Sequence, residues 1–123
     1  MSVPNFVILY VDSPTASAAF YADLLARPAI DASPTFAMFQ LHPDVMLGLW
    51  AKHAVEPAAV VTGGGGELAF SVDGNAAVDV LHADWSRRGL AMLQAPVELD
   101  FGYTFVARDP DGHRLRVYAP KPQ

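Results

Sequence analysis

Side chains that alternate along a few short apolar segments are the ones in this chain best placed to form a binding site. In a strand, neighbouring side chains point to opposite faces, so each segment divides into two sets. One set is uniformly apolar and is expected to pack under helices: Phe6, Ile8, Tyr10, Leu47, Leu49, Leu68, Phe70, Val72, Leu115 and Val117. The other set mixes apolar, aromatic and polar groups: Asn5, Val7, Leu9, Met46, Gly48, Trp50, Glu67, Ala69, Ser71, Arg114, Arg116 and Tyr118. Such a mixture is typical of a small-molecule pocket, whereas the solvent face of a sheet is normally more polar.

The common catalytic motifs are not found in the sequence. There is no cysteine, which excludes disulfides, thiolate catalysis and cysteine-ligated zinc. The four histidines do not cluster along the chain: His42, His53, His82 and His113. The glycine run 63–66 lacks the Lys-Ser/Thr of a phosphate-binding loop, and no nucleophile elbow occurs. We therefore expect binding through shape and a few polar contacts.

The elements that would position these side chains occur twice. In the first copy a strand is expected over residues 5–11 and a helix over 14–26, which Asp12-Ser13-Pro14 would begin. Two β-like runs follow at 35–41 and 45–51, and a weak strand lies near Ile30.

The second copy repeats this order. A strand begins at Glu67, and a helix opened by Asp73-Gly74-Asn75 runs to Arg88. Strands are then expected over residues 91–95, 103–108 and 114–118. The repeat predicts an α+β fold of two βαβββ modules. We assign residues 1–53 to the first module, 54–66 to a Gly-rich linker and 67–123 to the second module, within one structural domain.

Composition narrows the function classes. With 123 residues the chain is expected to form one compact unit, and a hydrophobic content of 52% suggests apolar surface hidden in a dimer or a ligand cavity. The net charge is −5 without a basic stripe, so no nucleic-acid partner is expected. The apolar run 6–11 is too short for a signal sequence or a membrane span. We expect a cytoplasmic protein with no membrane partner.

The ordered set of motifs resembles the vicinal oxygen chelate superfamily, which contains glyoxalases, extradiol dioxygenases and bleomycin- and fosfomycin-resistance proteins. The matching segments are Val11-Asp12, Ala19-Phe20-Tyr21 with Leu24-Leu25, Glu67–Asp73, and Asp109-Pro-Asp-Gly112 before the last strand. The resemblance implies paired βαβββ modules with a pocket between them. It also implies a homodimer, in which the modules pair within or across chains.

Enzymes of that superfamily hold a divalent metal at four pocket-facing strand positions. By motif register these positions are Asn5, Gly48, Glu67 and Arg116. Only Glu67 is a plausible ligand, while transition metals need three or four N, O or S donors. Arg116 would put a permanent cation where the metal charge should lie. We therefore expect no metal and no cofactor.

Glu67 and Arg116 are instead expected to pair with each other. Two interpretations remain open: the pair only neutralises two partly buried charges, or it orients polar groups of a ligand. The acidic net charge favours a neutral or cationic ligand, whereas Arg116 favours a carboxylate. The sequence does not decide between them.

Within the superfamily the chain is most similar to the phenazine-resistance binding proteins. The similarity lies in Leu49-Trp50-Ala51 with Glu56-Pro57, in Asp100-Phe101-Gly102 with Thr104-Phe105, and in Asp109–His113 with Arg116-Val117. It implies a cavity in which Trp50 stacks on a planar ring, and Gly48 beside it leaves room above the indole. The alternative for Trp50 is a core or dimer-interface residue. Trp85, at helical spacing with Val78 and Leu81, is expected in the core.

Four further residues are weaker candidates for the pocket wall: Tyr118, Phe39, Phe101 and Tyr103. Together these observations predict a metal-free homodimer, with modules paired within one chain or swapped between chains, that sequesters a small planar aromatic compound without transforming it. The alternatives are a metal-dependent lyase, isomerase or dioxygenase with other ligands, and a module whose pocket is vestigial.

Overall fold

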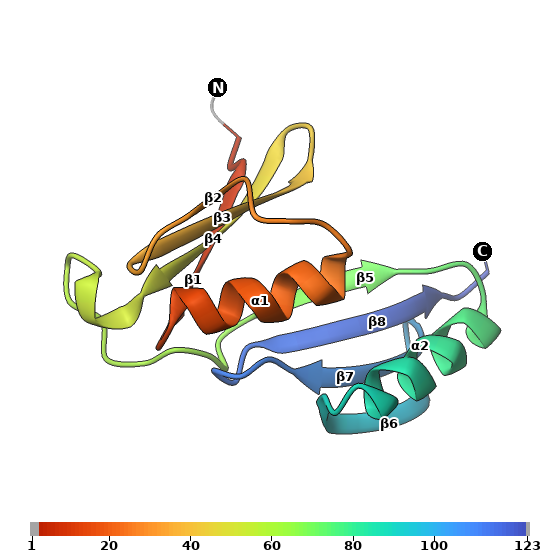
Figure 1. Cartoon of the computed structure of the whole chain (residues 1–123). Helices are drawn as coiled ribbons and strands as arrows, with labels where there is room; N and C mark the ends of the chain where they lie inside the picture. The colour runs from red at the N-terminus through yellow and green to blue at the C-terminus, as the bar shows by residue number, and fades with distance from the viewer. Residues whose placement is uncertain (1–2, 123) are drawn as a thin grey trace. The chain divides into compact units, whose positions relative to one another are not determined.

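The structure is a computed structural model that describes residues 3–122. It contains two four-stranded mixed sheets, and an α-helix packs on each (Figure 1). Contacts divide the chain into two compact units between Gly63 and Gly64. The repeated element order confirms the prediction of an α+β fold with two βαβββ modules.

The first unit holds the sheet with strand order β1-β4-β3-β2, in which β1 and β4 are parallel and the other pairs antiparallel. Its elements are β1 (Phe6–Val11), α1 (Pro14–Leu25), β2 (Asp31–Ala32), β3 (Phe36–His42) and β4 (Val45–Ala51). The weak strand expected near Ile30 is the two-residue β2. A 3₁₀ turn, η1 (Lys52–Ala54), follows β4.

Local sequence sets both ends of α1. The Ser13 hydroxyl accepts a hydrogen bond from the Ala16 N–H at 3.1 Å, and Pro14 occupies the first turn, where its missing N–H is not needed. The helix ends when Ala26 takes a left-handed conformation with φ 55°. The Tyr21 ring is fully buried, 6.5 Å from the ring of Phe39, so α1 covers the β3–β4 part of its sheet.

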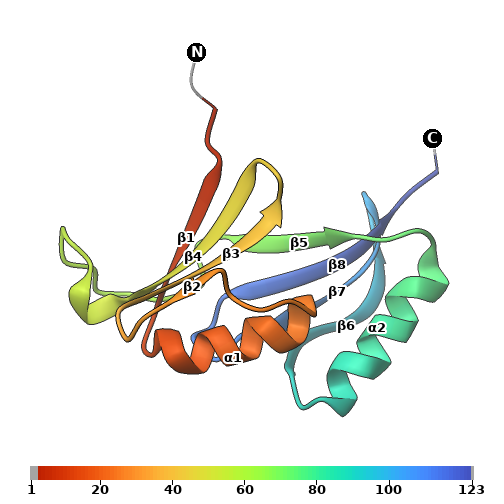
Figure 2. The same cartoon turned by 45° about the horizontal axis from the view of Figure 1, so that its top comes forward.

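The second unit holds the sheet with strand order β5-β8-β7-β6, in which β5 and β8 are parallel (Figure 2). Its elements are β5 (Glu67–Ser71), α2 (Asn75–Arg87), β6 (Ala91–Leu99), β7 (Gly102–Arg108) and β8 (Arg114–Pro120). Strand β6 is longer than predicted because it continues through Pro96. An edge strand tolerates a proline, and the β6–β7 register shifts around it.

The core of the second unit lies between its sheet and α2. Trp85 is 4% exposed and makes edge-to-face contacts with Phe70 at 5.6 Å and Phe105 at 5.4 Å between ring centroids. Leu115 and Val117 on β8 are fully buried on the same side. These contacts confirm the expected core role of Trp85.

The Asp-Pro-Asp-Gly turn joins β7 to β8. The Asp109 carboxylate accepts hydrogen bonds from the N–H groups of Asp111 and His113, each at 2.8 Å. The Asp109 side chain thus supplies the hydrogen-bond acceptor that a backbone carbonyl supplies in a helix or a sheet. It fixes the point at which β8 begins.

The predicted division of β1 into two faces is wrong. Parallel pairing places Phe6 opposite Met46, Ile8 opposite Gly48 and Tyr10 opposite Trp50. Directly paired residues share a face of the sheet, so these three side chains lie opposite to α1. Every residue from Phe6 to Val11 is apolar or aromatic. Without an alternation of polar and apolar residues, the sequence does not show which side chains face the helix.

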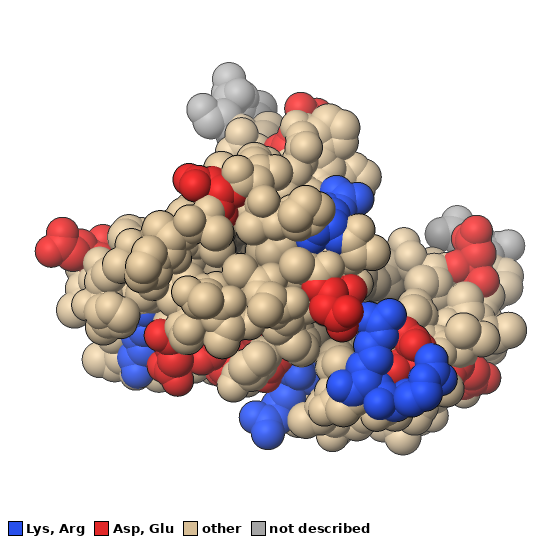
Figure 3. Space-filling model, viewed as in Figure 1, with Lys and Arg blue, Asp and Glu red and all other residues tan. Residues whose placement is uncertain are grey.

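Charged side chains on the surface occur in separate groups on the face shown in Figure 3. On α2, Asp84 pairs with Arg87 at 2.6 Å and with Arg88 at 3.2 Å. Within residues 3–122, no helix has the length and apolar character needed to cross a membrane.

Candidate functional site

Each sheet has one face turned away from the helix of its own unit, which we call its distal face. The distal face of the first unit carries these side chains in register: Phe6, Ile8 and Tyr10 from β1, Met46, Gly48 and Trp50 from β4, and Phe36, Met38 and Gln40 from β3. All but Gln40 are apolar or aromatic. This face therefore offers contact area for an apolar ligand but few hydrogen bonds.

An aromatic cluster forms around Trp50. The ring of Phe36 meets Trp50 edge to face at 6.4 Å and 78°, and it lies 6.3 Å from the ring of Phe6. Edge-to-face packing fixes the orientation of Trp50 without stacking a second ring on it. Trp50 is partly exposed, so part of the indole remains accessible.

Gly48 lies under two of these rings. A Cβ atom at this position would come within 2.7 Å of both Phe36 Cζ and Phe6 Cε1. No side chain fits there unless the rings move. The absence of a side chain at Gly48 is thus matched to the packing of its neighbours.

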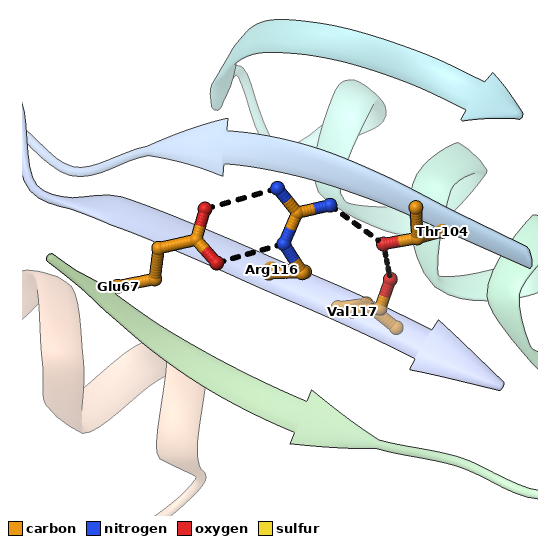
Figure 4. Close-up of polar contacts among 4 residues, drawn as sticks. All are labelled: Glu67, Thr104, Arg116 and Val117. Atoms are coloured by element: carbon orange, nitrogen blue, oxygen red, sulfur yellow. Dashed lines mark hydrogen bonds and ion pairs between the residues drawn. The ribbon is translucent and has the colours of Figure 1, made fainter. Parts of the chain in front are cut away.

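The distal face of the second unit carries polar groups. Its residues are Glu67, Ala69 and Ser71 from β5, Arg114, Arg116 and Tyr118 from β8, and Thr104, Val106 and Arg108 from β7. The guanidinium of Arg116 donates from Nε to one Glu67 oxygen at 2.8 Å and from Nη2 to the other at 3.0 Å (Figure 4). This bidentate geometry confirms that Glu67 and Arg116 pair.

Thr104 accepts a further hydrogen bond from Arg116. Its hydroxyl is fully buried, donates to the Val117 carbonyl at 2.8 Å and accepts from Nη1 of Arg116 at 3.2 Å (Figure 4). Because the hydroxyl proton is already used, only its lone pairs face the guanidinium. Three nitrogens of Arg116 are therefore held by two different side chains.

The ion pair shifts the titration of Glu67. Hydrogen bonds from Arg116 lower the pKa of the Glu67 carboxyl below its usual value of 4.5. Burial partly opposes this effect, and the charges of Arg116 and Arg114 lower the pKa further. Glu67 is consequently ionised at neutral pH.

Phe101 and Tyr118 border the ion pair. The Arg116 Cζ atom lies 5.6 Å from the Phe101 ring centroid, and the Phe101 ring meets Tyr118 edge to face at 6.1 Å. A cation over an aromatic face is favoured by the ring quadrupole. The structure thus groups two of the weaker candidates, Phe101 and Tyr118, with Arg116.

Three predicted site residues lie elsewhere. Phe39 is opposite Leu47 and fully buried against α1, and Tyr103 donates a hydrogen bond to Asp79 of α2 at 2.7 Å, so both point to the helix sides of their sheets. Asn5 precedes β1, and alternation along that strand puts Phe6 rather than Asn5 on the face of Gly48. These three assignments to the pocket wall are corrected.

Sequence reasoning placed Phe6 on the helix side of its sheet, left the face of Phe36 undetermined and missed Thr104. Phe6 and Phe36 lie on apolar runs whose phase a single sequence does not give. Thr104 is one position from Tyr103, and only the register of β7 against β8 shows which of the two faces away from the helix. A glycine between alternating large residues at 46–50 was the available signal that a neighbouring ring fills the space.

A divalent metal does not fit the residues at the positions where the superfamily holds one. Gly48 and Phe6 supply no donor atom, and both oxygens of Glu67 are engaged by Arg116. No group of three or more His, Asp or Glu side chains suited to a metal occurs among residues 3–122. The donor set falls short of the three or four ligands that a transition metal needs.

Comparison with known proteins identifies the family. The model of the glyoxalase/bleomycin resistance protein/dioxygenase superfamily matches residues 4–117. The chain belongs to this superfamily. It is 26% identical over 117 residues to the phenazine antibiotic resistance protein EhpR of Enterobacter agglomerans, covering 93% of this chain and 89% of EhpR.

Solved structures share the fold. A protein from Agrobacterium tumefaciens, solved by solution NMR, is 56% identical with a TM-score of 0.91, over 99% of this chain and 100% of that one. A glyoxalase-related enzyme from Fulvimarina pelagi is 21% identical with a TM-score of 0.83, over 97% and 88% of the two chains. The superfamily includes both resistance proteins and enzymes, so membership alone does not fix the activity.

Proposed function

We propose that this protein binds a small planar aromatic compound of the phenazine type without a metal and sequesters it by stacking on Trp50. The observation that carries the proposal is the cluster at Gly48, where the rings of Phe6 and Phe36 occupy the space in place of a metal ligand and Phe36 packs edge to face on Trp50. The similarity to EhpR, a phenazine antibiotic resistance protein, supports the same choice of ligand.

Sequestration requires binding of the ligand but no catalysed reaction. A resistance protein that only binds its drug needs affinity and no turnover, and an apolar aromatic face supplies affinity through buried area. The distal face of the first unit has this character, and no general acid or base lies on it apart from the phenol of Tyr10. Nothing further is required of a binding protein.

Tryptophan fluorescence tests the proposal directly. In a Trp85→Phe background the remaining indole is Trp50, and phenazine is expected to quench its emission in a saturable manner. The matched control is Trp50→Phe, in which the buried Trp85 reports and saturable quenching should be absent. If no planar aromatic compound quenches Trp50, stacking on this residue is wrong.

Metal analysis tests the competing enzymatic function. A stoichiometric transition metal that survives dialysis of the purified protein would contradict a metal-free binder. It would favour a lyase, isomerase or dioxygenase whose metal ligands lie at other positions of the chain.

The proposal includes self-association into a homodimer. Its support is apolar surface on the edge strand β1, where Phe6 and Val7 are each 38% exposed and Ile8 is 43% exposed. An exposed apolar edge strand is a surface that proteins normally cover. Sedimentation equilibrium measures this: a monomer at micromolar concentration would contradict the dimer.

A further inference from the structure

We propose that a hollow at the β6–β7 turn of the second unit binds a small zwitterion, a compound that carries an ammonium group, a carboxylate and an apolar part. The hollow has a volume of about 490 Å³ and is lined by Glu98, Leu99, Asp100, Phe101 and Lys121. Sites for small molecules typically measure roughly 300–1,000 Å³. All five residues belong to the second unit, so this binding does not depend on a ligand of the first.

Two backbone contacts fix the shape of the hollow. Gly102 begins β7 with φ 152°, and a Cβ atom there would overlap the carbonyl oxygen of Ala119 in β8. The Lys121 N–H donates a hydrogen bond to the Phe101 carbonyl at 3.0 Å. The segment after β8 is therefore held against the β6–β7 turn, which keeps Lys121 beside the acidic residues of that turn.

Charges of both signs line the hollow. Glu98 and Asp100 supply two carboxylates and Lys121 one ammonium group, and all three residues are exposed. Among residues 3–122, none of these three side chains forms an ion pair or a side-chain hydrogen bond. Because they do not neutralise each other, both signs of charge are available to a ligand.

Glu98 and Lys121 also line a second hollow, which has a volume of about 360 Å³. Asn75 at the start of α2 lies on its wall. The two oppositely charged residues are therefore common to both hollows, and a ligand that contacts them has room to extend on either side.

This arrangement of charges favours a zwitterion over a ligand with one charge. An ammonium group alone is attracted by Glu98 and Asp100 but repelled by Lys121, and a carboxylate alone meets the reverse. A zwitterion can place each of its charges against the opposite one. Since the three side chains are exposed, solvent and salt screen them, and the preference is expected to be modest.

The apolar part of the ligand has a surface to contact. Phe101 is 46% exposed, and Leu99 beside the turn is half-buried. The Phe101 ring meets Tyr118 edge to face at 6.1 Å, and the Arg116 Cζ atom lies 5.6 Å from its centroid, so its orientation is set by neighbours. An exposed ring held in place suits an aromatic side chain on the ligand.

Three probes that share one ring test the inference. Phenylalanine is the zwitterion, phenethylamine lacks its carboxylate, and 3-phenylpropionate lacks its ammonium group. Each is titrated into isotope-labelled wild-type protein at neutral pH and low salt, and the backbone amide shifts are followed by NMR. The shifts give the dissociation constant and also show which amides lie near the probe.

We expect phenylalanine to cause saturable shifts at residues 98–102 and at Lys121, and to bind at least about threefold more tightly than either analogue. Lys121→Gln should lower the affinity for phenylalanine to that for phenethylamine, and Glu98→Gln should weaken phenylalanine without weakening 3-phenylpropionate. The matched controls are Lys52→Gln and Glu56→Gln, which remove the same charges in the first unit and should change neither affinity.

The ranking of the three probes in the wild-type protein tests the inference even if a variant does not fold. It would be overturned by the absence of saturable shifts at these amides, by equal affinities, or by an analogue that binds as tightly as phenylalanine. Unchanged affinity in both Lys121→Gln and Glu98→Gln would overturn it as well. None of these results affects phenazine binding at Trp50, so the two proposals fail separately.

Discussion

The Cζ atom of Phe36 lies 2.7 Å from the point that a Cβ atom on Gly48 would occupy. Phe36 also packs edge to face on Trp50 at 6.4 Å, so one ring both covers the glycine and orients the indole. A substitution at Gly48 therefore acts on the Trp50 surface through Phe36, without a direct contact of its own to a ligand.

Gly48→Ala is expected to lower the free energy of unfolding by about 1–2 kcal/mol, because the added methyl group displaces two packed rings. It should also weaken phenazine binding, since Trp50 loses its fixed orientation. Urea denaturation and fluorescence titration measure the two effects. Gly65→Ala is the control, because a Cβ there meets no atom within 4 Å. Equal stability of the two variants would contradict the packing described at Gly48.

Trp50→Ala is expected to reduce affinity for phenazine at least tenfold, or about 1.4 kcal/mol, because the stacking surface is removed. Its stability should change less than that of Trp85→Ala, which empties a core position and should lose about 3–5 kcal/mol. Titration and thermal unfolding of both variants check the difference. A Trp50→Ala protein that binds normally would rule out stacking on this residue.

The stability contributed by Glu67 should depend on pH. Its pKa is lowered by Arg116, so the ionised form favours the folded state above the usual value of 4.5, and this contribution is lost as the pH falls through the lowered pKa. At neutral pH, Glu67→Gln should be less stable than the wild-type protein by about 1 kcal/mol, a modest value because the pair is partly exposed.

Urea denaturation of both proteins from neutral pH downward measures this difference. It should shrink as the wild-type carboxyl becomes protonated. A wild-type advantage that persists at strongly acidic pH would mean that Glu67 acts through packing instead of charge.

Tyr103→Phe should reduce stability slightly and leave ligand affinity unchanged, because the phenol bonds to Asp79 on the helix side of its sheet. The hydrogen bond to Asp79 raises the pKa of Tyr103 above its usual value of 10.0. The contribution of this hydrogen bond to folding stability is therefore complete at lower pH and is lost as the pH rises through the raised pKa. Ultraviolet titration of tyrosinate in the two proteins checks the shift. A loss of affinity in Tyr103→Phe would return this residue to the binding site.

The amino-acid sequence by itself determined the duplicated βαβββ order, the ends of α1, the core role of Trp85 and the pairing of Glu67 with Arg116. These features follow from caps, turn residues, helical spacing and alternation within strands where polar and apolar residues differ. The same alternation placed Glu67, Arg116 and Tyr118 on one face correctly.

Only the tertiary structure decided which side of β1, β3 and β7 faces the helix. The runs from Phe6 and from Phe36 carry apolar side chains on both faces, so a shift by one residue changes nothing visible in the sequence and reverses every side chain in space. The pairing of β1 and β3 with β4, and of β7 with β8, determined which side chains face the helix. It brought Phe6 and Phe36 to Gly48 and Thr104 to Arg116, and it turned Phe39 and Tyr103 toward the helices.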